Sequence, residues 1–226
     1  MSNVTYKYIR RNNEIQAYIN HADAALLSIG YTEHSNAHVE KAAKTAFDIL
    51  SCLGYDERDC ELAQIAAYMH DIGNVVNRSD HAQTGGLMAF RLLEKMDMPA
   101  DEIAVIISAI GNHDEKTAMP VNPVAAALIL ADKMDVRRSR VRNSHIEDPS
   151  GFATDVHDRV NYACVESKYY FSEDKSELFL DLIIDLKISS IIDYFEIFLE
   201  RMLLCRRAAK TLNVEFRLVI NNYKVM

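Results

Sequence analysis

Histidine and aspartate side chains recur along the sequence in positions where they could bind a metal ion together. The dipeptide His-Asp occurs three times, at His70-Asp71, His113-Asp114 and His157-Asp158. Imidazole nitrogens and carboxylate oxygens together suit Mn²⁺, Fe²⁺, Co²⁺, Ni²⁺ or Zn²⁺. Because the dipeptide is repeated, its setting within the expected helices has to decide which copies belong to a site.

Several of these side chains are expected on the inward faces of helices. Ala63, Ala66 and Ala67 precede His70 at the spacing of one helix face, and their small side chains would let neighbouring helices approach closely. His113 extends a stripe of isoleucines in the same way. His38 lies four residues before an alanine of its own helix's buried face.

Asp132 is the most informative carboxylate. It follows Ala125, Leu128 and Ile129 on an apolar helix face, and a buried carboxylate without a partner costs several kcal/mol. A neighbouring Lys or Arg would satisfy it as well as a metal ion would, and a single helix-end histidine is more often a surface or capping residue. The convergence of several such ligands favours a metal site, and the absence of a nearby thiol argues against structural zinc.

The elements that must hold these residues are mostly helices, because the chain has only seven Gly and four Pro and many Ala, Leu, Ile and Met. Gly54 and Gly73 are expected to end helices, and Asp80 is expected to cap one. Apolar periodicity predicts helices over 37–53, over 57–71, after Asp80 to about Lys95, from Pro99 to about 110 and from Pro123 to about Asp135, with one or two more in 5–29.

The pattern changes after about residue 160. KYYF (168–171) and ELFLDLIID (177–185) are typical of a hairpin, a helix is expected over 188–212, and VEFRLVI (214–220) alternates like a strand. We therefore predict a mainly α protein: a helical domain over 1–160 and a C-terminal α+β segment over 161–226, with 143–160 as the connection.

Composition narrows the function classes. The 226 residues include 25 basic and 33 acidic ones, a net charge of −8, which argues against a broad nucleic-acid surface. Four scattered cysteines and no expected signal peptide indicate a reducing, cytoplasmic location. The apolar runs are too short or too charged for a membrane span.

Three segments in order resemble the H…HD…D signature of the HD-domain metal-dependent phosphohydrolases, a helical superfamily. They are HVEKAAKTAFDILSCLGYD with His38, IAAYMHDIG with His70 and Asp71, and ILADKMD with Asp132, all within 34–140. The resemblance implies an HD-domain helical bundle in which these four residues bind metal and Asp71 can bridge two ions. His34, one turn before His38, is an alternative first ligand.

By similarity to two-metal relatives, such as the symmetrical diadenosine tetraphosphate hydrolases and the HD-GYP phosphodiesterases, His81 and His113 would hold a second ion. The sequence also departs from these relatives. Asn74 stands where many members have lysine, and the absence of the GYP signature counts against cyclic di-GMP as substrate. His157-Asp158 lies outside the pattern.

The resemblance implies hydrolysis of a phosphate ester or nucleotide through a metal-activated water. Asp71, Asp114 and Lys133 are the candidate catalytic residues, with Asp114 as a positioning or proton-transfer group. A basic run follows the last ligand, and its guanidinium groups suit phosphate; a solvated helix end paired with carboxylates is the simpler alternative. The candidate substrate-binding residues are Arg137, Arg138 and Arg142.

Two other functions stay open at this point: a nucleotide-binding regulator without turnover, and a structural helical protein with incidental histidines. The C-terminal strands are consistent with a homodimer paired through an exposed edge and equally with a monomer. Neither the substrate nor the metal, nor whether one or two ions bind, follows from the sequence.

Overall fold

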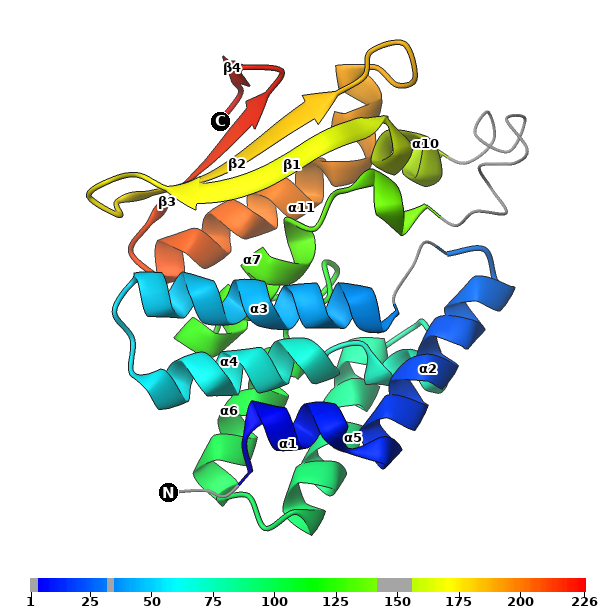
Figure 1. Cartoon of the computed structure of the whole chain (residues 1–226), viewed down its shortest axis with the longest axis vertical. Coiled ribbons are helices and arrows are strands. Elements are labelled where there is room, and N and C mark those ends of the chain that lie inside the picture. The colour runs from blue at the N-terminus through cyan, green and yellow to red at the C-terminus, as the bar shows by residue number, and fades with distance from the viewer. Residues whose placement is uncertain (1–3, 32–34, 142–155) are drawn as a thin grey trace. The chain divides into compact units, whose positions relative to one another are not determined.

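The computed structural model describes residues 4–31, 35–141 and 156–226, and it divides into two compact units, one ending at Asp132 and one beginning at Lys133 (Figure 1). The first unit is helical. Its elements are α1 (Tyr6–Arg11), α2 (Asn13–Ser28), α3 (Asn36–Cys52), α4 (Glu57–Met69), the short 3-10 helix η1 (Ile72–Val75), α5 (His81–Lys95), α6 (Ala100–Gly111) and most of α7 (Pro123–Lys133).

Helices α3 and α4 form a pair joined by a short connection, and they lie side by side in Figure 1. Both helices carry fully buried small residues, Ala42 and Ala46 on α3 and Ala63 and Ala66 on α4. Small side chains at the contact allow helix axes to approach at the lower end of the usual 8–10 Å range. This close packing brings the ends of the two helices, where His38 and His70 lie, next to each other.

Helix α7 is buried along most of its length. Every residue from Val124 to Ala131 is buried, as expected for a helix that is apolar on all sides. Asn122 caps it by accepting a hydrogen bond from the Ala125 amide at 2.7 Å, and Pro123 occupies the first turn, where a missing N–H costs nothing. The helix ends at Lys133, two residues before the predicted end at Asp135.

The predicted helix ends are mostly confirmed, with one correction. Gly54 follows α3 with a φ of +82°, a conformation that glycine adopts without strain. Asp80 does precede α5, but it has a left-handed backbone with φ 58° and its side chain makes no capping hydrogen bond. Its backbone conformation turns the carboxylate away from the amides that an ordinary N-cap serves.

The second unit is an α+β segment. It contains η2 (Arg138–Arg140), α10 (Val156–Ala163), β1 (Cys164–Phe171), β2 (Glu177–Ile184), α11 (Ile191–Thr211), β3 (Glu215–Ile220) and β4 (Tyr223–Lys224). The sheet order is β1-β2-β3-β4 (Figure 1). β1 and β2 form the predicted antiparallel hairpin, whereas β2 and β3 are parallel, because α11 carries the chain back across the sheet between them.

The mainly α architecture with a small C-terminal α+β segment is confirmed. The units divide after Asp132, whereas the sequence analysis placed the boundary at residue 160, because η2 and α10 pack with the C-terminal elements. Helix α10 and strand β4 were not predicted.

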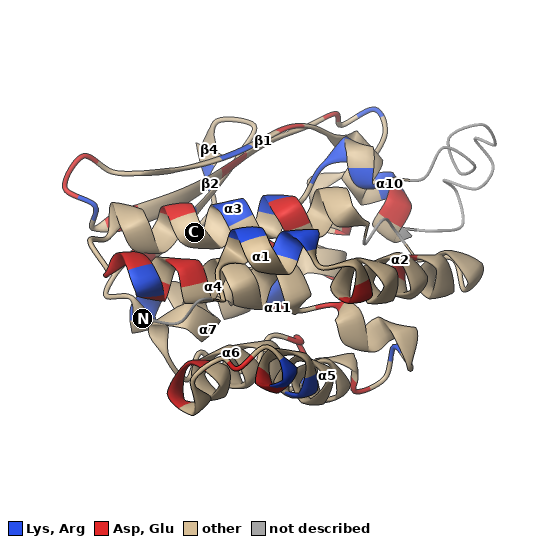
Figure 2. Cartoon of the chain, turned by 60° about the horizontal axis from the view of Figure 1, so that its bottom comes forward, with Lys and Arg blue, Asp and Glu red and all other residues tan. Residues whose placement is uncertain are grey.

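Within the described ranges, no helix is both long and apolar enough to cross a bilayer. Figure 2 shows acidic and basic residues together on α3 and α4.

Candidate metal centre

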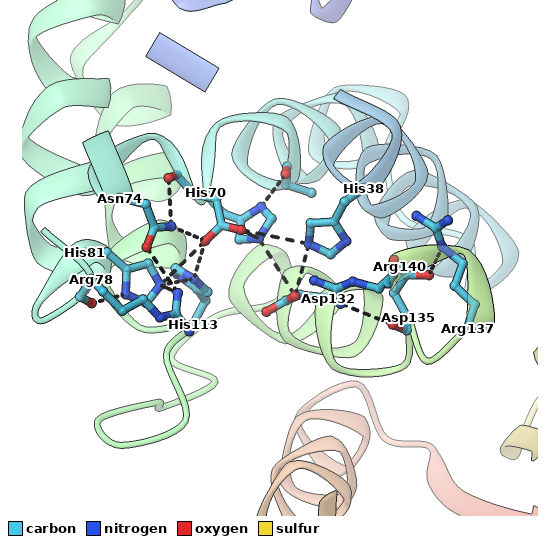
Figure 3. Close-up of polar contacts among 12 residues, drawn as sticks. His38, His70, Asn74, Arg78, His81, His113, Asp132, Asp135, Arg137 and Arg140 are labelled. Carbon is cyan, nitrogen blue, oxygen red and sulfur yellow. Dashed lines mark hydrogen bonds and ion pairs between the residues drawn. The ribbon is translucent and has the colours of Figure 1, made fainter. Parts of the chain in front are cut away.

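The first ligand group lies where α3, α4 and α7 meet (Figure 3). His38 is the third residue of α3 and is fully buried, and Asp132 is next to last in α7. The His38 Nε2 atom lies 3.4 Å from Asp132 Oδ1 and 3.9 Å from Asp71 Oδ2. The His70 Nε2 atom lies 3.2 Å from Asp71 Oδ2 and 3.8 Å from Asp132 Oδ1. Two imidazoles and two carboxylates thus converge from three helices.

A second ligand group uses the other oxygen of the same carboxylate. Asp71 Oδ1 lies 3.6 Å from His81 Nε2 and 4.0 Å from His113 Nε2, and these two nitrogens are 3.2 Å apart. His81 is the first residue of α5, and His113 follows the end of α6. Because Asp71 directs Oδ2 to the first group and Oδ1 to the second, its carboxylate is placed to bridge two ions.

Backbone hydrogen bonds set the orientation of three imidazole rings. The Nδ1 atoms of His70, His81 and His113 lie 2.7, 3.1 and 2.6 Å from the carbonyl oxygens of the residues three positions earlier. A carbonyl only accepts, so each Nδ1 carries the proton and donates it. Each Nε2 therefore presents a lone pair to the ligand groups, the arrangement that metal-binding histidines adopt.

The donor atoms fit a divalent ion. Ligand bonds of about 2.1 Å place neighbouring donors roughly 3.0 Å apart in octahedral geometry and roughly 3.4 Å apart in tetrahedral geometry. The observed separations of 3.2–4.0 Å need only small inward movements. The buried Nε2 of His70 forms no hydrogen bond within the described part of the chain, and the Nε2 atoms of His81 and His113 lie 3.2 Å apart.

The electrostatics of the first group favour a positive charge. Burial opposes protonation of His70, but the carboxylates of Asp71 and Asp132 outweigh it and raise the pKa of His70 above its ordinary value. The negative charge of these two carboxylates can be balanced either by a proton on His70 or by a metal ion in the first group.

Two glycines allow η1 and α5 to approach closely enough to form the second group. A Cβ atom on Gly73 would lie 2.0 Å from the carbonyl oxygen of His81 and 2.5 Å from the amide nitrogen of Gly85. A Cβ on Gly85 would in turn lie 3.2 Å from the carbonyl oxygen of His70. Gly73 was predicted to end a helix, but α4 ends at Met69 and Gly73 lies within η1, where its lack of a side chain brings Asp71 close to His81.

Two residues near the second group were not among the predicted site residues. The Asn74 side-chain amide donates to Asp71 Oδ1 at 2.8 Å and to the Asp71 carbonyl at 2.9 Å, which holds the shared carboxylate in place. Arg78 donates from Nη1 to Asn74 Oδ1 at 3.2 Å and lies 3.3 Å from His81 Nε2 (Figure 3). Asn74 lies three residues after Asp71, and Arg78 lies three residues before His81. This spacing from a ligand is the sequence signal that could have identified them.

The structure does not bring all predicted residues to the ligand groups. Asp114 is half-buried, and its carboxylate belongs to none of the possible metal-ligand groups formed by the described residues. In the C-terminal unit, Arg137 pairs with Asp135 at 3.0 Å, and Arg138 donates to the Tyr162 carbonyl at 2.6 Å and stacks on the Tyr162 ring. Lys133 is buried at the end of α7. Arg142 and His34 lie outside the described residues.

Part of the chain is similar in sequence to known proteins. The chain is 23% identical over 159 aligned residues to an uncharacterized protein of Methanocaldococcus jannaschii, with 61% of each chain covered, so it spans about three fifths of that relative's length. It is 25% identical to the crystal structure of a predicted HD superfamily hydrolase from an uncultured Thermotogales bacterium, covering 58% of this chain and 73% of the other with a TM-score of 0.43. Residues 32–137 match the HD domain family, and this part of the chain is an HD domain of that superfamily.

Proposed function

We propose that the protein is a metal-dependent phosphohydrolase that acts on a phosphate ester, with nucleotides as the first substrates to test. The observation that carries this proposal is the position of the Asp71 carboxylate. Its Oδ2 lies near the Nε2 atoms of His38 and His70, and its Oδ1 lies near those of His81 and His113. A protein that only needed histidines for packing would not have to direct their Nε2 lone pairs at a common carboxylate.

The chain's own residues would hold one or two divalent ions, with Mn²⁺, Fe²⁺, Co²⁺, Ni²⁺ and Zn²⁺ all compatible with nitrogen and oxygen donors. Such an ion supplies Lewis acidity and lowers the pKa of water in its coordination sphere. The described ligands come from five separate elements and are nearly all buried, so their geometry is set by packing before substrate arrives. The hydrogen bond that the Asn74 side chain donates to Asp71 Oδ1 orients the shared carboxylate.

Phosphate recognition by Lys133, Arg137, Arg138 and Arg142 stays a prediction. Its support is the sequence: a run of cations directly after the ligand Asp132 in an otherwise acidic chain. The hydrogen bond that Arg138 donates from Nε to the Tyr162 carbonyl uses one of the five N–H groups of its guanidinium. The cytoplasmic location, a homodimer and a role for Asp114 in positioning or proton transfer are likewise predictions.

The test is metal content by elemental mass spectrometry together with phosphate release from a panel of phosphomonoesters and nucleotides. The samples are the wild type, His70→Ala, Asp71→Ala and a control, His21→Ala, which removes an exposed histidine of α2 outside the ligand groups. We expect near-stoichiometric metal and phosphate release in the wild type and the control, and loss of both in the two ligand variants.

Each alternative function gives a different result. Metal bound by the wild type without turnover of any substrate in the panel would support a nucleotide-binding regulator. A wild type that takes up no metal after incubation with Mn²⁺, Fe²⁺ and Ni²⁺ would refute the metal centre itself and leave the histidines a structural role.

A further inference from the structure

Arg78 contacts the second ligand group although it is not a metal ligand. It lies in the loop between η1 and α5, and its side chain is half-buried. Its guanidinium group lies over the Tyr31 ring, with the central carbon 5.4 Å from the ring centroid, and Nη1 reaches both Asn74 Oδ1 and His81 Nε2. A fixed positive charge is therefore present beside the atoms that would bind a second ion.

The contact with His81 uses the lone pair that a metal ion would need. The His81 Nδ1 atom donates its proton to the Arg78 carbonyl, so Nε2 has only its lone pair to offer, and Arg78 Nη1 lies 3.3 Å from it. One lone pair cannot serve a guanidinium N–H and a metal ion at once. The positive charge of Arg78 would also repel an ion bound between His81 and His113.

Arg78 is well suited to leave this position for an anion. Within the described part of the chain, its only hydrogen-bond contacts are made by Nη1, which leaves Nε and Nη2 available for a bidentate contact with phosphate oxygens. Its position in a loop rather than within a helix allows the side chain to move without disturbing the packed ligands.

We propose that Arg78 controls occupancy of the second metal position. Without an oxyanion, the Arg78 guanidinium contacts His81 Nε2 and opposes binding of the second ion. When a phosphate group binds, the guanidinium moves to the phosphate oxygens, and the His81 lone pair becomes available to the ion. This inference rests on the proposed phosphohydrolase function for the nature of the anion. It requires positive coupling between the second ion and phosphate, and by thermodynamic reciprocity each strengthens the binding of the other.

The test is a Mn²⁺ titration of the metal-free full chain by equilibrium dialysis and elemental mass spectrometry, with and without inorganic phosphate at a concentration that leaves Mn²⁺ soluble. The electron paramagnetic resonance spectrum reports a coupled pair of ions independently of activity. The variants are Arg78→Gln, which removes the charge, and Arg78→Lys, which keeps it. Arg91→Gln is the control, because Arg91 is an exposed arginine of α5 paired with Glu94.

In the wild type and in Arg91→Gln we expect a tight first ion, a weaker second ion, and strengthening of the second by phosphate. In Arg78→Gln we expect the second ion to bind about tenfold more tightly without phosphate, with the phosphate effect lost and the first ion unchanged. Arg78→Lys should keep the weak second position, and it carries the test if circular dichroism shows that Arg78→Gln does not fold.

Other results overturn the inference in distinguishable ways. If the wild type binds two ions and Arg78→Gln changes neither the second affinity nor its dependence on phosphate, Arg78 does not control the second position. Weakening of both ions in folded Arg78→Gln would instead make Arg78 a structural support. A wild type that binds no Mn²⁺ at all would refute the proposed metal centre, and this inference with it.

Discussion

Gly73→Ala is predicted to separate the two ligand groups without removing any ligand. The added Cβ would lie 2.0 Å from the His81 carbonyl oxygen and 2.5 Å from the Gly85 nitrogen, and side-chain carbons essentially never come within 3.0 Å of such atoms. Both obstacles are backbone, so they cannot swing aside. The contact with the carbonyl alone requires η1 and α5 to move apart by at least 3.0 minus 2.0, or 1.0 Å.

That displacement is large enough to break the second group. If it falls along the Asp71 Oδ1 to His81 Nε2 separation of 3.6 Å, the distance becomes 3.6 plus 1.0, or 4.6 Å. Two donors on opposite sides of one ion are at most about 4.2 Å apart, twice a bond of about 2.1 Å. Asp71 and His81 could then no longer share an ion, whereas His38, His70 and Asp132 would keep the first one.

The assay combines Mn²⁺ equivalents by elemental mass spectrometry with thermal unfolding of the metal-free protein. Gly86→Ala is the matched control: it adds the same carbon at another buried glycine, in α5 rather than η1, but its nearest neighbour, the Ile107 carbonyl oxygen, is 3.3 Å away. We expect Gly73→Ala to lose the second ion and roughly 1–3 kcal/mol of stability, or about 2–4 °C in Tm for each kcal/mol. The close-approach argument would be refuted if Gly73→Ala bound two ions and had the same Tm as Gly86→Ala.

Two further predictions concern stability. Gly111 ends α6 with open space where a Cβ would lie, so Gly111→Ala should raise the free energy of unfolding by about 0.5–1 kcal/mol in urea denaturation; a loss of stability would show that the site is not open. Because the pKa of His70 is raised in the folded state, the stability that its protonation gives the metal-free protein is present below about pH 6.5 and is lost as pH rises through the folded pKa. Urea denaturation from pH 6 to pH 9 should show this decline in wild type but not in His70→Ala, and parallel curves would contradict it.

Helix positions could be predicted from the sequence because the burial of each helix follows from the period of its apolar residues. α3 covers Asn36–Cys52 against a prediction of 37–53, and α5 ends at Lys95 as predicted. The parallel pairing of β2 with β3 could not be predicted in this way, because alternation indicates a strand but not its partner. β4 has only two residues, too few for any periodicity.

The ligands of the candidate centre could be proposed from helix faces and family motifs, but their surroundings could not. Asn74 and Arg78 are polar residues in an irregular segment, where no periodicity indicates which way a side chain points. Their contacts depend on η1, whose short 3-10 turns return the chain toward His81. Conversely, the arginine run after Asp132 looked uniform in sequence, and folding gives Arg137 and Arg138 different partners.

The position of His70-Asp71 at a helix end explains why this dipeptide serves the centre. Neighbouring residues inside a helix point about 100° apart and do not face each other, so a His-Asp pair within a helix, such as His157-Asp158 in α10, cannot direct both side chains at one ion. α4 ends at Met69, and Asp71 has φ −96° and ψ 1°, in the sparsely populated bridge region. This change of direction returns the Asp71 carboxylate to within 3.2 Å of His70 Nε2 while its other oxygen faces α5. The pair therefore depends on the break in the helix, and extending α4 through residue 71 would separate its two ligands even with both residues kept.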